Sequence, residues 1–130
     1  SIGYEYSHLR EPHILAWFRS KCETEGANIN PPEKEKEHIL GKLNEAVVFE
    51  NFLHTKYIGQ KRFSLEGGEN TIPALDKIIR RAVEFGVQEV VIGMAHRGRL
   101  NVLANIMGKT YYEIFNEFER GSNPDLTMGD

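Results

Sequence analysis

A chain of 130 residues, 40% of them hydrophobic and 27% charged, has the size and composition of one globular domain with a full core. Its formal net charge of -3 argues against a general nucleic-acid binder, and no apolar run approaches the roughly 20 residues that cross a bilayer. The single cysteine excludes an internal disulfide, which is compatible with a reducing compartment. From these features together we expect an intracellular protein without a nucleic-acid or membrane partner.

The first part of the chain has helical patterning. Apolar residues share one helical face over residues 12–22, and residues 30–33 have the pattern of a helix start in which Asn30 is the cap. Helical spacing continues over residues 39–57, with a break or bend expected near residues 41–44. We therefore predict a helical region over residues 1–58.

The clearest helix of the chain is predicted over residues 71–85, after a glycine-punctuated loop at residues 59–69. Its apolar residues lie on a single stripe, and Gly86 is placed to end it. A strand is predicted over residues 89–94, because four of the five residues 90–94 are apolar without alternation, which is typical of a strand that is buried on both faces.

Two more helices are predicted near the end of the chain. Residues 100–107 end at Gly108, and apolar residues over 111–118 follow at helical spacing. Residues 121–130 are mostly polar and contain glycine and proline, so we expect a flexible tail.

The lone strand decides the expected fold class. A strand buried on both faces needs backbone partners on both sides, and no second segment has strand composition. We therefore predict an α/β fold in the form of a mainly helical piece of a larger protein, with one buried parallel-type strand at residues 89–94. A second copy of the chain that supplies the partner strands is the alternative.

A histidine and two arginines follow this strand at once: His96, Arg97 and Arg99, around Gly98. In open α/β sheets, ligands bind in the crevice at the carboxyl ends of the strands. Imidazole and guanidinium groups at that place indicate a site for an anion.

Several blocks of the sequence resemble the thiamine diphosphate-dependent component of 2-oxoglutarate dehydrogenase. The specific blocks are Gln60–Glu69, Ile72–Leu75 and Gly93–Asn105, with further likeness at Gly3–Tyr6 and Ile114–Phe118. The resemblance places residues 59–130 at the start of a diphosphate-binding α/β domain in an enzyme several times longer.

The resemblance implies oxidative decarboxylation of 2-oxoglutarate with thiamine diphosphate and Mg2+. The succinyl group would pass to the lipoyl domain of a dihydrolipoyl succinyltransferase, and the enzyme would be a homodimer in the bacterial cytoplasm or the mitochondrial matrix. His96 is expected to contact the substrate and to stabilise charge during catalysis. Arg62 is expected to bind the diphosphate of the cofactor.

The residues alone leave other roles open. His96 could equally cap local backbone groups, and pairing of Arg62 with Glu66 or Glu69 in its own loop is the simpler interpretation of that arginine. Arg97 and Arg99 could both anchor their loop to neighbouring carboxylates.

Other functions for the whole chain also stay open. One is a sister enzyme that acts on 2-oxoadipate, and another is a non-enzymatic helical module that pairs its strand with a partner protein. The histidines are not at metal-ligand spacing, and the family's Mg2+ ligands are expected beyond Asp130. The isolated 130 residues are therefore expected to be inactive.

Overall fold

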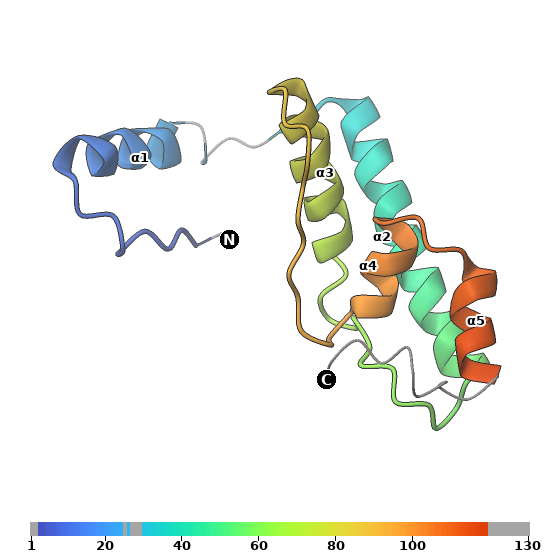
Figure 1. Cartoon of the computed structure of the whole chain (residues 1–130). Coiled ribbons are helices and arrows are strands. Elements are labelled where there is room, and N and C mark those ends of the chain that lie inside the picture. Colours follow the sequence, from blue (N-terminus) through green and yellow to red (C-terminus); the bar gives the residue numbers. More distant parts are fainter. Residues whose placement is uncertain (1–2, 25, 27–29, 120–130) are drawn as a thin grey trace. The chain divides into compact units, whose positions relative to one another are not determined.

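The computed structural model describes residues 3–24, 26 and 30–119. Within these residues all the regular secondary-structure elements are helices (Figure 1). The helices are α1 (Pro12–Thr24), α2 (Glu33–Lys56), α3 (Thr71–Glu84), α4 (Arg99–Asn105) and α5 (Tyr111–Glu119). Among the described residues, none of the helices is both long and apolar enough to cross a membrane.

The chain divides into two compact units, Ser1–Lys36 and Glu37–Asp130. In the first unit, none of the residues of α1 is buried, and the ring of Tyr6 packs on that of Phe18 with 5.2 Å between centroids. The second unit holds all of the buried apolar residues that the structure describes. The predicted domain boundary after residue 58 stays a prediction.

The core of the second unit is organised along α2. Ala46, Phe49 and Leu53 lie at helical spacing on one stripe, and each is buried. Ala46 packs in one cluster, with Leu65, Ile72 and Val102. Phe49 and Leu53 pack in a second cluster, with Ile114 of α5. Because both clusters depend on one helix, α2 joins the α3–α4 side of the unit to α5.

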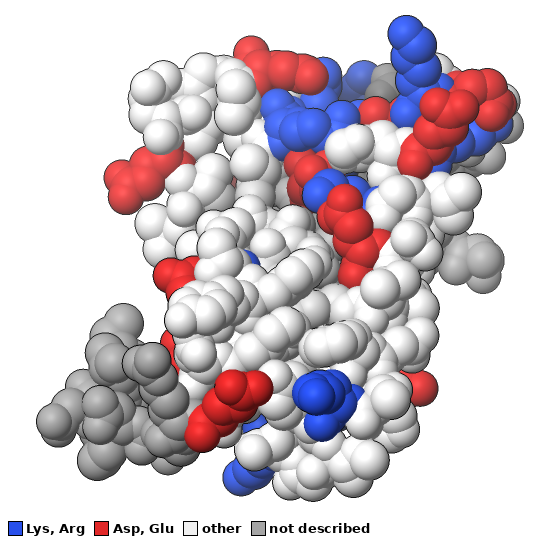
Figure 2. Space-filling model, turned by 90° about the vertical axis from the view of Figure 1, so that its right-hand side faces the viewer, with Lys and Arg blue, Asp and Glu red and all other residues white. Residues whose placement is uncertain are grey.

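An aromatic groove lies between α2 and α5. It is lined by Val48, Phe49, Phe52, Tyr111 and Phe115. Figure 2 views the molecule from the side on which α5 lies and shows a broad area without charged residues. The α2–α5 contact is therefore made by rings, several of which remain partly exposed.

The helix ends agree only in part with prediction. Gly86 has a φ of 78° and directly follows the C-cap residue of α3, as predicted. Gly108 also has a positive φ, of 73°, but α4 already ends at Asn105, with Ile106 as its C-cap. The amide of Lys36 donates to the carbonyl of Pro32, so α2 begins after Pro32, and Asn30 is not its cap. The reason is that Pro32 disfavours helical geometry at the residue before it. The predicted break near residues 41–44 is also absent, because α2 is continuous there.

The predicted α/β fold is wrong, because the described residues contain no strand. Residues 87–95 form a non-helical connection from α3 to α4 (Figure 1). Val91 is 86% exposed and Val90 46% exposed. An apolar run becomes a strand only where a second extended segment supplies its hydrogen bonds, and no described segment pairs with this one. The tail predicted at residues 121–130 lies outside the described residues.

A polar contact joins α2 to α3. The Nε2 atom of His38 lies 2.7 Å from Oδ2 of Asp76, and Nε of Arg80 donates to the same oxygen at 2.8 Å. Burial alone would raise the pKa of Asp76, but the hydrogen bonds and charges of His38 and Arg80 hold that pKa below its ordinary value. The ionised carboxylate therefore stabilises the fold.

We predict that Asp76→Asn destabilises the protein near neutral pH and that this effect disappears in acid. Because the folded-state pKa is lowered, the stabilisation is present above the unfolded carboxyl pKa of about 3.9 and is lost as pH falls through the lower folded value. Urea denaturation of both proteins between neutral pH and about pH 2.5 measures the difference. A difference that stays constant over this range would contradict the assignment.

Candidate functional site

Two loops meet in front of α4 and form the junction, which we define as residues 62–65 and 96–98. The amide of Gly98 donates to the carbonyl of Phe63 at 2.8 Å, and Nη1 of Arg97 donates to the carbonyl of Ser64 at 3.1 Å. The rings of Phe63 and His96 lie 4.0 Å apart between centroids. The structure thus brings together the two loops in which sequence analysis placed candidate ligand-binding residues.

Gly98 allows the two loops to approach so closely. Its φ of 72° lies in the left-handed region, which residues with a Cβ atom rarely adopt. A Cβ atom at this position would also clash with the side chain of Leu65. Leu65 is itself buried against Ile72 and Val102. Glycine at position 98 is therefore required by both backbone conformation and packing.

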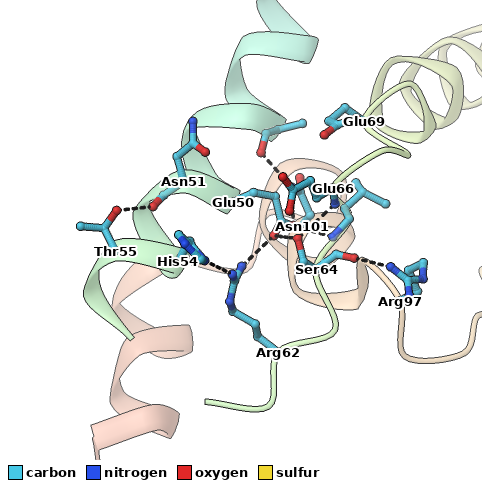
Figure 3. A network of polar contacts seen from close by, with 12 residues as sticks. Glu50, Asn51, His54, Thr55, Arg62, Ser64, Glu66, Glu69, Arg97 and Asn101 are labelled. Carbon is cyan, nitrogen blue, oxygen red and sulfur yellow. Dashed lines mark hydrogen bonds and ion pairs between the residues drawn. The ribbon is translucent and has the colours of Figure 1, made fainter. Parts of the chain in front are cut away.

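The carboxylate of Glu50 holds the junction from inside the unit (Figure 3). Its Oε1 atom accepts hydrogen bonds from the amide of Leu65 and from Nδ2 of Asn101, each at 3.1 Å. Its Oε2 atom accepts from Oγ of Ser64 at 2.8 Å and from Nη1 of Arg62 at 3.2 Å. Glu50 is only 8% exposed, and four donors satisfy its buried charge.

Asn101 connects the same carboxylate to α4. Its side chain is fully buried, and Nδ2 donates to the carbonyl of Ala46 at 3.0 Å as well as to Glu50. Its Oδ1 atom accepts from Nδ2 of Asn105 at 2.7 Å. Among the described residues, no buried side-chain nitrogen or oxygen lacks a hydrogen-bond partner. The network therefore fixes α2, α4 and the first loop to one another.

Arg62 points into this network, as Figure 3 shows. Besides its contact with Glu50, its Nη2 atom lies 2.9 Å from Nδ1 of His54. The structure does not bear out pairing with the acids of its own loop, since Glu69 instead accepts from the amide of Gly67 at 3.0 Å. The guanidinium is thus held by α2, and its expected contact with a diphosphate stays a prediction.

His96 lies at the surface of the junction. Its side chain is exposed, and its ring packs on Phe63 with the two planes tilted by 36°. Arg97 anchors its loop, which is one of the roles that the sequence left open, but it does so through a backbone carbonyl and not through a carboxylate. Arg99 is the exposed first residue of α4. The expected substrate contact of His96 is untested and stays a prediction.

Three residues that shape this site were not predicted from the sequence: Glu50, Asn101 and Phe63. Glu50 did carry a signal, because it falls on the stripe of Ala46 and Leu53 and is a charged residue on an apolar face. The burial of Asn101 and the backbone conformation of Phe63 depend on tertiary contacts, for which the sequence offers no local pattern.

The junction offers donors for an anion and not ligands for a metal. The described residues contain no group of three histidine, cysteine, aspartate or glutamate side chains that could hold a metal ion. Arg62 and His96 instead present N–H groups from the two loops, and N–H groups suit carboxylate and phosphate oxygens.

We predict that Glu50→Gln lowers the free energy of unfolding by roughly 3 kcal/mol, because it leaves the guanidinium of Arg62 without its counter-charge and removes two acceptor sites. Urea denaturation provides the measurement. Glu45→Gln is the matched control on the same helix, since Glu45 forms an exposed pair with Lys42, and we expect a change within about 0.5 kcal/mol. Equal effects of the two substitutions would contradict the role of Glu50.

Comparison with known proteins places the chain in a family, although no family model matches it. It is 53% identical over 128 residues to a multifunctional 2-oxoglutarate metabolism enzyme of Mycolicibacterium vanbaalenii, which covers 98% of the chain and 10% of that enzyme. It is 48% identical over 130 residues to the 2-oxoglutarate dehydrogenase E1 component of Cupriavidus necator, covering the whole chain and 14% of the relative. The E1 component of Brucella canis is likewise 48% identical over 130 residues, which are 99% of the chain and 13% of the relative.

The chain thus spans between 10% and 14% of the length of these curated relatives, and the match leaves almost none of its own residues uncovered. The matched stretch covers both loops of the junction. The resemblance in the sequence blocks is thereby confirmed, and the chain belongs, as one segment, to the family of the 2-oxoglutarate dehydrogenase E1 component.

Proposed function

We propose that this segment serves an enzyme that oxidatively decarboxylates 2-oxoglutarate and transfers the succinyl group to the lipoyl domain of a dihydrolipoyl succinyltransferase. The observation that carries the proposal is the identity of 48% to 53% over the whole chain with proteins that are named for 2-oxoglutarate. Thiamine diphosphate, Mg2+ and a homodimeric state belong to the same proposal, as does a place in the bacterial cytoplasm or the mitochondrial matrix.

His96 is proposed to contact the 2-oxo acid. The proposal is supported by the exposed position of its imidazole on the surface of the junction, which leaves it accessible to a small molecule. An imidazole N–H that donates to an oxygen of the substrate would stabilise negative charge as it develops there. The imidazole would act as a positioned donor.

Arg62 is proposed to bind the cofactor's diphosphate. A guanidinium has five N–H donors, and the contacts with Glu50 and His54 engage one Nη atom each, so further N–H groups remain for a phosphate oxygen. Glu50 offsets the charge of Arg62 and fixes the orientation of its guanidinium group. This arrangement favours a directed hydrogen bond to the phosphate over a general attraction of anions. Once bound, the cofactor would supply the electron sink for decarboxylation.

In the full-length enzyme, we predict that His96→Ala lowers kcat/KM for 2-oxoglutarate by about 100-fold or more, because the charge-stabilising donor is lost. Thiamine diphosphate affinity, measured by fluorescence titration, should change little. Arg62→Met should have the opposite pattern, in which the main effect is a weaker affinity for thiamine diphosphate. His13→Ala is the control for loss of an imidazole, since His13 is exposed on α1.

The same assay separates the proposed substrate from 2-oxoadipate. We expect the wild-type enzyme to prefer 2-oxoglutarate when both acids are supplied separately with the succinyltransferase component. Preference for 2-oxoadipate would contradict the substrate assignment, and full activity of His96→Ala would contradict the role of that residue.

A further inference from the structure

The backbone of Phe63 adopts a conformation that bulky residues avoid. Phe63 has a φ of 44°, and among the described residues it is the one residue other than glycine with a positive φ. Such a conformation is disfavoured for a residue with a Cβ atom and persists only where surrounding contacts impose it. Here the Phe63 carbonyl accepts from Gly98, and the next two residues are bound to Glu50.

Packing of the core does not explain this strain. The side chain of Phe63 is 36% exposed, and its ring meets His96, whose side chain is also exposed. Nζ of Lys61 lies 5.3 Å from the centroid of the same ring. The strained backbone therefore presents a phenyl ring to an imidazole at the surface, where burial of apolar area gains little.

We propose that Phe63 is a positioning residue for His96, and that the left-handed backbone at Phe63 serves to hold the ring against the imidazole. The proposal rests on the proposed function of His96 and names the residue that sets its orientation. An exposed imidazole with no neighbour on its face exchanges among rotamers, whereas one packed at 4.0 Å on a fixed ring has fewer available. A small displacement of a group that must meet a reacting atom is sufficient to slow catalysis.

Phe63→Gly separates positioning from folding in the full-length enzyme. Glycine adopts a positive φ without strain, so the backbone of the junction should keep its conformation and the midpoint of thermal unfolding should not fall. The ring is lost, so kcat for 2-oxoglutarate should drop at least about tenfold while KM stays within about threefold. Phe63→Tyr keeps the ring, and we expect it to retain kcat within about twofold.

A readout other than activity is the position of the imidazole. A crystal structure of the full-length wild type should show His96 in one rotamer. A crystal structure of Phe63→Gly should show the His96 side chain displaced or distributed over more than one rotamer. Phe85→Gly is the matched control, because it also removes an exposed phenyl group, here from the end of α3 where the ring lies by Arg81. It should leave kcat and the His96 rotamer unchanged.

The results separate this inference from the proposed function. Wild-type kcat in Phe63→Gly, or a tenfold loss in Phe63→Tyr, would overturn the positioning role, while the loss of kcat/KM expected for His96→Ala and the proposed function would stand. If His96→Ala itself retained full activity, the function proposed for His96 would fail, and the positioning role would fail with it.

Discussion

A carboxylate inside a small helical unit needs a complete set of hydrogen-bond donors, and this requirement organises the unit around Glu50. An ionised group with so little exposure is tolerated only where its charge is matched and its oxygens are satisfied. Here the donors come from two places: the loop after α2, which supplies Arg62, Ser64 and the Leu65 amide, and Asn101 of α4. Because one group accepts from all of them, none can move far without disturbing the others.

The same constraint gives the junction its shape. Leu65 is held from one side by Glu50, and its side chain fills the space in front of Gly98. The loop before α4 must then pass close enough for the Gly98 amide to reach the Phe63 carbonyl. The exposed pair of Phe63 and His96 is consequently supported by buried contacts one and two residues away in the chain. This support suits a surface side chain that must keep a fixed orientation.

The sequence predicted the helices better than it predicted the connection between them. The stripe of α3 and the glycine at position 86 are local signals, and the structure agrees with them. The strand predicted at residues 89–94 is not formed, because a strand depends on a second extended segment as its hydrogen-bonding partner, and the described chain does not contain one. Apolar composition shows that a segment favours burial, but it does not supply the second segment that would pair with it.

The candidate site divides in a similar way. Arg62 and His96 were identified from residue type and resemblance, and the structure places their loops in contact. Glu50 and Asn101 are distant in sequence and meet only after folding, so their shared role could not be predicted from spacing. Of the two, only Glu50 has a signal in the sequence, because it is an acidic residue on an otherwise apolar stripe.

The most direct test of the central role of Glu50 is hydrogen exchange, followed by mass spectrometry, in the full-length wild type and Glu50→Ala. Peptides over residues 62–66 and 96–99 should be protected in the wild type, because the Leu65 and Gly98 amides are hydrogen-bonded. Both sets of peptides should lose protection together in the variant. Peptides from α3 should remain protected. Rapid exchange of residues 62–66 in the wild type, or unchanged protection of both loops without the carboxylate, would contradict the central role of Glu50.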